Sequence, residues 1–104
     1  MELEVRNKSI ERELCLLRRV LGITQSDFAA ALGITKQTMS RIEGNKTDLS
    51  TDIGTRLYFA LTELLEPPDI DLLDPVQLFA IKEFMPRLKQ HIQKSGIYIQ
   101  IAGR

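Results

Sequence analysis

The sequence around Gly33 places the strongest constraint on what this chain can fold into. Apolar residues share one helical face on each side of this glycine: Phe28 and Leu32 before it, and Met39 and Ile42 after it. Glycine readily adopts the left-handed backbone conformation that ends a helix. The span from Thr24 to Asn45 therefore predicts two short helices joined by a tight turn.

Polar residues at the beginning of each segment support the same interpretation. Thr24 and Thr35 each precede a segment, and a threonine side chain can accept a backbone hydrogen bond as a helix N-cap. Asp27 adds an acid to the first turn, where the helix dipole favours negative charge. Ile34, inside the turn, is expected to fix the angle between the helices. A chance match would have to satisfy all of these unrelated constraints.

The second segment carries a polar outer face suited to contacts with DNA bases. Its residues are Lys36, Gln37, Ser40 and Arg41, with Thr38 at the edge. In the major groove, Gln can bond bidentately to adenine and Arg to guanine, and each good pair gives roughly 1–3 kcal/mol of discrimination. Ordinary solvated helices carry the same residue types, so the preceding turn decides the interpretation. We predict base contacts from these four residues: Lys36, Gln37, Ser40 and Arg41.

Residues 14–61 resemble the Xre/Cro family of helix-turn-helix repressors, which share the lambda-repressor-like fold. The similar positions are the run from Leu21 to Gln25, the small residues Ala29 and Gly33, and the run from Arg41 to Lys46. The resemblance implies an all-helical domain whose second motif helix, the recognition helix, enters the major groove of double-stranded DNA.

The same resemblance implies roles for residues outside the polar face. Arg18 and Glu43 match the positions of a partly buried ion pair that joins the first helix to the end of the third. Gln25 is expected to contact a phosphate and to brace the start of the recognition helix, and the loop after that helix is expected to follow the phosphates. The expected phosphate contacts are Gln25, Thr35, Thr38, Asn45 and Lys46.

The positive charge of this chain is local. The 14 basic and 14 acidic residues give no net charge, which excludes a strongly basic protein that coats DNA. Between Arg18 and Lys46, however, five basic residues face only Asp27 and Glu43. Few phosphate contacts per subunit favour DNA binding as a dimer.

Composition also excludes several other classes of protein. A single cysteine, Cys15, excludes an intramolecular disulfide and a multi-cysteine zinc site. The chain has one histidine, His91, and no recognisable carboxylate pair or phosphate-binding glycine loop. Nothing in the sequence therefore indicates an enzyme. No apolar run approaches the ~20 residues of a membrane span. We expect a cytoplasmic protein with no metal, no cofactor and no obvious room for a separate small-molecule domain.

Two further helices are expected on either side of the motif. The first runs from near Ser9 to Leu21 and completes the domain on the N-terminal side. The other follows the loop, is capped by Ser50 or Thr51, and should run without a break to Glu66.

A C-terminal helix is expected after a hinge at Pro67 and Pro68, which cannot continue the preceding helix. Asp74 is its expected N-cap and Pro75 its first residue. Pro86 should kink this helix or split it after Met85. Its apolar seam, which should pack either on its own chain or on a partner, consists of Leu78, Ile81, Met85, Leu88 and Ile92.

The last residues change to alternating patterning, which is typical of a strand. Its expected dimerisation residues are Ile97, Tyr98, Ile99 and Ile101. A lone strand cannot satisfy its own backbone, so we expect it to pair with the same strand of a second subunit about a two-fold axis. A frayed tail, or strand addition to a different protein, are the alternatives.

These expectations describe an all-α, lambda-repressor-like bundle with an added C-terminal helix and a short dimerising strand. Residues 1–66 would form the DNA-binding domain, and residues 67–104 a dimerisation or partner-binding extension. The expected function is a homodimeric transcriptional regulator, a repressor on a palindromic operator. One alternative is an antitoxin that represses its own operon and binds a toxin through residues 67–104. A protein-interaction adaptor without DNA is the other, and it would not need the polar helix face.

Overall fold

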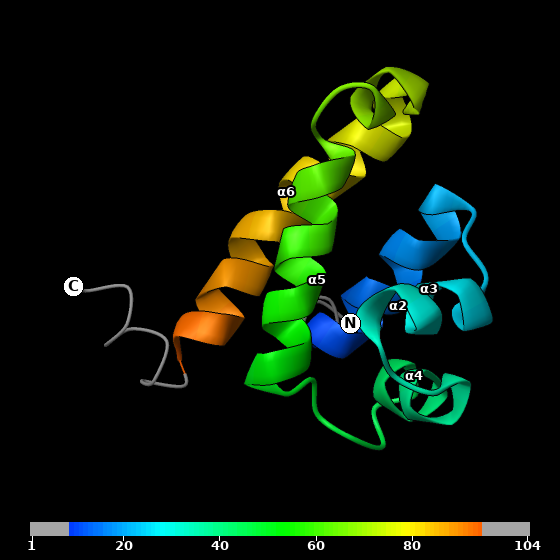
Figure 1. The fold of residues 1–104 in the computed structure, drawn as a ribbon. Coiled ribbons are helices and arrows are strands. Elements are labelled where there is room, and N and C mark those ends of the chain that lie inside the picture. The colour runs from blue at the N-terminus through cyan, green and yellow to red at the C-terminus, as the bar shows by residue number, and fades with distance from the viewer. Residues whose placement is uncertain (1–8, 95–104) are drawn as a thin grey trace, which may run out of the picture. The chain divides into compact units, whose positions relative to one another are not determined.

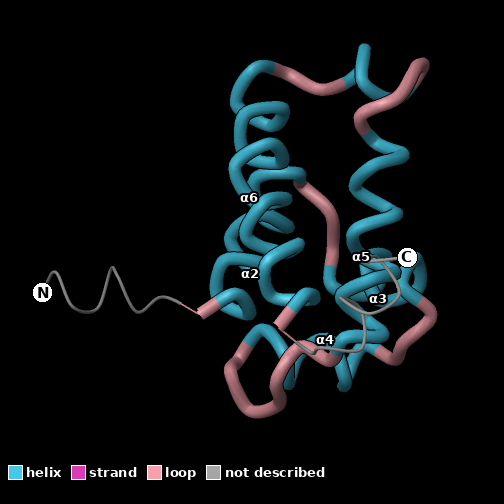
Figure 2. Tube along the Cα trace, turned by 90° about the vertical axis from the view of Figure 1, so that its left-hand side faces the viewer, coloured by secondary structure: helices cyan, strands magenta, loops and turns pink. Residues whose placement is uncertain are grey.

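The computed structural model describes residues 9–94, which are helical between short turns and loops (Figure 1). Its elements are α2 (Ile10–Leu21), α3 (Gln25–Leu32), α4 (Lys36–Glu43), α5 (Thr51–Leu64), the 3-10 helix η1 (Asp69–Leu72) and α6 (Pro75–Gln93). Figure 2 shows no strand in the described part of the chain. The expected strand at residues 97–101 lies outside the described residues. Two compact units, Met1–Leu49 and Ser50–Arg104, are described in turn.

Helix ends in the first unit confirm the predicted caps. Thr24 and Thr35 each accept a hydrogen bond from the backbone N–H three residues further on, and Ser9, which was predicted only as the approximate start of its helix, does the same. Gly22 and Gly33 both have φ of 73°, in the left-handed region, and each terminates the helix before it. Because both ends of the turn between α3 and α4 are fixed by local hydrogen bonds, the direction in which α4 leaves the turn is also fixed.

The core of the first unit is apolar and places α4 firmly. Helix α4 contacts both α2 and α3. Met39 and Ile42 of α4 are fully buried, whereas Ile34 in the turn is half-buried. The other buried apolar residues of this unit are Leu14, Leu17, Phe28, Ala29, Leu32 and Leu49. The inner face of α4 is thus held by packing, and its outer face is left to solvent.

Helix α5 in the second unit is one unbroken helix, as predicted. Ser50 is its N-cap and accepts from the backbone N–H of Ile53. The helix ends at Leu64, two residues earlier than the predicted end at Glu66. Pro67 disfavours the α conformation for the residue before it, and Glu66 instead donates to the carbonyl three residues earlier, as in a 3-10 turn. The prediction of the C-terminal boundary was therefore wrong by half a turn.

Helix α6 begins with the predicted capping box. The Asp74 carboxylate accepts from the Gln77 backbone N–H at 2.8 Å, and the Gln77 side-chain oxygen accepts from the Asp74 N–H at 3.1 Å. Pro86 lies inside α6, which is assigned as a single helix. The alternative of a split after Met85 is therefore wrong. Proline removes one backbone donor, and the helix continues on both sides of that missing bond.

Helices α5 and α6 pack against each other, and η1 also contacts α5 (Figure 1). Three of the predicted seam residues are buried, namely Ile81, Leu88 and Ile92, while Leu78 and Met85 are half-buried. Phe84, which the seam did not include, is also buried. Of the two alternatives for the seam, the structure thus shows packing of α6 on its own chain.

Several large apolar side chains of the second unit face solvent instead. Phe59 of α5 is 63% exposed, Leu72 of η1 is 81% exposed, and Val76 and Phe79 of α6 are 67% and 65% exposed. A monomeric protein gains nothing from leaving such side chains in water, and clusters of them often mark contacts with another molecule.

Candidate nucleic-acid interface

The outer face of α4 carries the residues that the sequence assigns to base contacts. Lys36, Gln37, Ser40 and Arg41 are all exposed. Lys36 and Gln37 occupy the first turn of the helix, the part that approaches the bases most closely when a helix of this motif enters the major groove. The structure thus presents all four side chains to solvent from a rigidly packed helix.

Two threonines hold each other at the beginning of α4. The Thr35 hydroxyl oxygen accepts from the Thr38 backbone N–H at 3.0 Å, and the same hydroxyl donates to the Thr38 hydroxyl oxygen at 2.9 Å. Thr38 therefore keeps its own hydroxyl proton for an external acceptor such as a phosphate oxygen. Both were predicted to contact phosphates, and the structure places them next to each other.

Asn45 sets the direction of the loop that leaves α4. It has φ of 62°, and its backbone N–H donates to the Ile42 carbonyl at 3.0 Å. The next backbone N–H, from Lys46, donates to the Arg41 carbonyl at 2.8 Å. The same two backbone hydrogen bonds end α2 and α3, where a glycine takes the left-handed position. After α4 an asparagine takes that position. Lys46, the predicted phosphate ligand, is exposed immediately after this reversal.

The Arg41 side chain is oriented by the same loop. Its Nε atom donates to the Thr47 hydroxyl at 3.3 Å. The two terminal guanidinium nitrogens have no hydrogen-bond partner among residues 9–94. Because a bidentate contact with guanine needs two free N–H donors, this arrangement leaves Arg41 equipped for it.

A long-range hydrogen bond ties Asn45 to the beginning of α2. The Ser9 hydroxyl donates to the Asn45 side-chain oxygen at 3.0 Å, while it accepts from the Arg12 backbone N–H at 3.1 Å. Asn45 was predicted as a phosphate contact through its position in the loop. With its oxygen bound to Ser9, only the side-chain amide nitrogen remains to donate to a phosphate.

Glu11 fastens the far end of the same loop, and sequence reasoning missed it. Its side chain is buried, and one carboxylate oxygen accepts from the Leu49 backbone N–H at 2.8 Å. Glu11 looks like an ordinary acid in the first turn of a helix, so its sequence position carries no signal of this role. The one available hint is Leu49, a lone apolar residue in an otherwise polar loop.

Arg18 and Glu43 form a bidentate ion pair between α2 and the end of α4. Arg18 Nε lies 2.7 Å from Glu43 Oε2, and Arg18 Nη2 lies 3.0 Å from Oε1. The third guanidinium nitrogen donates to the Ile23 carbonyl at 2.7 Å. The two side chains are 12% and 3% exposed, respectively. All three nitrogens of the guanidinium thus donate to groups inside the domain, which indicates that Arg18 supports the fold.

Gln25 joins this network rather than the start of α4. Its side-chain nitrogen donates to Glu43 Oε1 at 2.9 Å. The expected bracing of the beginning of the recognition helix is therefore not what the side chain does. Glu43 is the last residue of α4, and its carboxylate has lone pairs to spare after binding Arg18. One proton of the Gln25 amide nitrogen still remains for the predicted phosphate contact.

The ionisation of the pair follows from these contacts. Burial raises the pKa of the Glu43 carboxyl, but hydrogen bonds from Arg18 and Gln25, together with the positive charge of Arg18, outweigh burial and lower this pKa below its ordinary value. The hydrogen bond with Glu43 likewise raises the pKa of Arg18. Both groups are charged over the whole physiological range, so they neutralise each other. The basic residues left between positions 18 and 46 are Arg19, Lys36, Arg41 and Lys46, against Asp27.

Comparison with known proteins identifies a domain in part of the chain. Residues 16–57 match the helix-turn-helix family, a range that begins inside α2 and ends inside α5. This chain carries a helix-turn-helix domain of the Xre/Cro type. The resemblance drawn from Gly33 and its surroundings is therefore confirmed. No curated protein and no solved structure is significantly similar to the chain.

The matched segment supports a general function. Helix-turn-helix domains of this type bind DNA, so the match supports a DNA-binding regulator. Within residues 9–94, none of the helices combines the length and hydrophobicity needed to cross a bilayer.

Proposed function

We propose that this protein is a transcriptional repressor that binds a palindromic operator as a homodimer. The observation that carries the proposal is the exposed polar face of α4, held from behind by a buried apolar face and at its end by the Arg18–Glu43 pair. A rigid helix with free donors at fixed positions is what recognition of base edges requires.

In the proposed complex, the polar face of α4 lies in the major groove. Arg41 donates through its two terminal nitrogens to a guanine, and Gln37 pairs with an adenine, with Lys36 and Ser40 contacting neighbouring base edges. The surrounding groups contact the two phosphate backbones. They position α4 along the DNA but do not distinguish one base sequence from another. These groups are Gln25, Thr35, Thr38, Asn45 and Lys46.

Two copies are needed because one copy offers few phosphate contacts. Once Arg18 is neutralised by Glu43, the motif retains four basic residues against one acid. A dimer doubles these contacts and holds two recognition helices roughly 34–36 Å apart, one turn of the DNA helix. The affinity for two linked half-sites then exceeds that for one by a large factor. We place the dimer contact in residues 67–104, at the alternating sequence that contains Ile97, Tyr98, Ile99 and Ile101.

A toxin-binding antitoxin is the second candidate, and one observation favours it. Leu72, Val76 and Phe79 expose apolar surface within residues 67–104, on the described part of the proposed extension. A second protein could cover this surface while the helix-turn-helix domain represses the shared operon. In the homodimer proposal, the second copy would have to cover it.

Selection of bound fragments from random DNA tests the main proposal. The full chain is mixed with random duplexes, and bound fragments are sequenced and then used in sedimentation experiments. An inverted repeat bound by two copies supports the homodimeric repressor. Enrichment of a single unrepeated site bound by one copy contradicts it, and no enrichment at all favours the adaptor. A reporter gene placed behind the selected site distinguishes repression from activation.

A further inference from the structure

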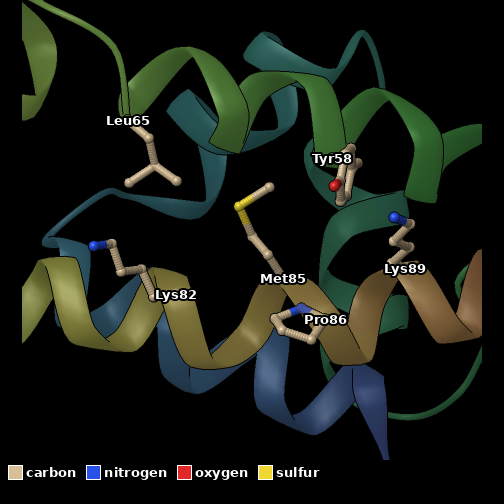
Figure 3. Close-up of a pocket in the computed structure, with 6 residues that line it drawn as sticks. All are labelled: Tyr58, Leu65, Lys82, Met85, Pro86 and Lys89. Atoms are coloured by element: carbon tan, nitrogen blue, oxygen red, sulfur yellow. The ribbon is translucent and has the colours of Figure 1, made fainter.

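A shallow cavity of about 420 Å³, largely open to solvent, lies between α5 and α6 in the second unit (Figure 3). It lies outside the helix-turn-helix motif, and none of the DNA-contact residues takes part in it. Its six lining residues are Tyr58, Leu65, Lys82, Met85, Pro86 and Lys89. A volume of this size falls within the range of small-molecule sites in proteins.

The middle of the cavity is apolar. Figure 3 shows the Met85 side chain pointing from α6 toward α5, with Leu65 on one side and the Tyr58 ring on the other. Pro86 lies beside Met85 on α6. Methionine is flexible and adapts to ligands of varied shape, so this floor can accommodate an aliphatic chain or a ring.

Two lysines flank this apolar middle. Lys82 and Lys89 are seven residues apart on α6, which separates their backbone positions by about 10 Å along the helix axis. Both are exposed, and neither makes a hydrogen bond or ion pair within residues 9–94. The positions three and four residues away on α6 hold no acid for either lysine. Those positions hold Leu78, Phe79, Met85, Pro86, Ile92 and Gln93.

We propose that this cavity binds a small organic anion with an apolar body, such as a medium-chain carboxylate. The apolar body lies over Met85 between Leu65 and Tyr58, and the acid group pairs with the ammonium of Lys82 or Lys89. Charge complementarity selects this ligand class, because the cavity is lined by two cations and no carboxylate. The proposal does not depend on operator binding, because every lining residue belongs to the second unit.

The three methionines of the chain provide a direct test. The full chain is labelled with ¹³C at the methionine methyl groups and titrated with sodium octanoate, with octan-1-ol as the neutral analogue and acetate as the anion without an apolar body. Octanoate should shift the Met85 methyl signal in a saturable way. Met39, fully buried in the first unit, is the internal control and should not move.

Lysine variants identify the charge contribution. The variant that carries both Lys82→Gln and Lys89→Gln should weaken octanoate binding about two- to fivefold, as expected for one solvent-exposed ion pair, and the larger effect of the two single variants identifies the lysine that pairs with the acid group. Lys94→Gln, at the C-cap of the same helix and outside the cavity, is the matched control and should have no effect. Because all three lysines are exposed, the variants should melt at the same temperature as the parent chain.

Several outcomes would overturn the proposal. Equal affinity for octanoate and octan-1-ol would show that the cavity does not select an anion. Shifts at Met39 equal to those at Met85, or a Met85 shift that never saturates, would show general detergent-like binding. Unchanged octanoate affinity in the variant that carries both Lys82→Gln and Lys89→Gln would remove the lysines from the site.

Discussion

Gln25 at the beginning of α3 is joined to Glu43 at the end of α4 by a 2.9 Å hydrogen bond. Since Glu43 also binds Arg18 of α2, one carboxylate connects α2, α3 and α4. The position of the recognition helix relative to the predicted phosphate ligand Gln25 is therefore fixed by a single side chain. A change at Glu43 should affect both the stability of the domain and the geometry of its DNA contacts.

Removal of one member of the Arg18–Glu43 pair should destabilise the domain strongly. Arg18→Ala leaves a buried carboxylate without a partner, at an expected cost on the order of 3–5 kcal/mol in the free energy of unfolding. The double variant Arg18→Ala with Glu43→Ala should lose less than the sum of the two single losses. Denaturant unfolding of the three variants measures this coupling, and simple additivity would count against the pair.

Stability should also fall in acid because of Glu43. Its pKa in the folded chain lies below the unfolded value of 4.5, so its contribution is fully present above pH 4.5 and is lost as the pH falls through the folded value. Melting temperatures measured between pH 7 and pH 2 should therefore decline below about pH 4.5. Glu43→Gln is the control, and a decline of equal size in that variant would exclude Glu43 as the cause.

Base contacts and phosphate contacts should be separable by substitution. Arg41→Ala and Gln37→Ala should each weaken binding to the selected operator by roughly 1–3 kcal/mol, with little change on random DNA. Lys46→Ala should instead weaken binding to all sequences and reduce the salt dependence by about one phosphate contact. Titrations of both DNAs at several salt concentrations distinguish the two patterns. Equal losses for Arg41→Ala on operator and random DNA would show that Arg41 does not read bases.

Asn45 combines a backbone role with a side-chain role, and two variants separate them. Position 45 has φ of 62°, a conformation that asparagine tolerates better than alanine does. Asn45→Ala should therefore destabilise the domain by about 1–2 kcal/mol. Asn45→Gly removes the same hydrogen bond to Ser9 while it favours the left-handed backbone. Thermal melts should therefore rank the glycine variant above the alanine variant. The opposite order would show that the left-handed backbone at position 45 does not limit the stability of the domain.

Deletion of residues 96–104 should convert the proposed dimer into a monomer or a much weaker dimer without unfolding residues 9–66. The apolar stripes of the helices supply the core, whereas the strand proposed for residues 97–101 would need backbone partners from a second chain. Operator affinity should then fall steeply, because the half-sites are no longer linked. Sedimentation of the truncated chain checks this prediction. A tight dimer after truncation would move the interface to the apolar surface at Leu72, Val76 and Phe79.

The features that could be predicted from the sequence are those determined within a few residues. The caps at Thr24, Thr35 and Asp74 each depend on a bond to a residue three positions away, so their signal is local. The glycine at position 33 likewise determines its turn through its own backbone freedom. Such contacts need no knowledge of the tertiary structure.

The features that were not predicted depend on residues distant in the sequence, or on how a helix accommodates a proline. Glu11 and Leu49 are 38 residues apart, and Ser9 and Asn45 are 36 apart, so no local pattern reveals either contact. Pro86 removes only one backbone donor of α6, so the helix continues past it without a split. The burial of Phe84 depends on tertiary packing, and the predicted seam did not include this residue.

The buried hydrogen bond from the Leu49 backbone to Glu11 allows the opening of the loop after α4 to be measured by hydrogen exchange. An amide proton exchanges with deuterium from the solvent only when its hydrogen bond opens, so the Leu49 signal measures how often the loop behind the recognition helix detaches from α2. That single resonance can be followed without DNA and compared before and after DNA is added. Slower exchange in the complex would show that the loop is clamped by the phosphates that it follows.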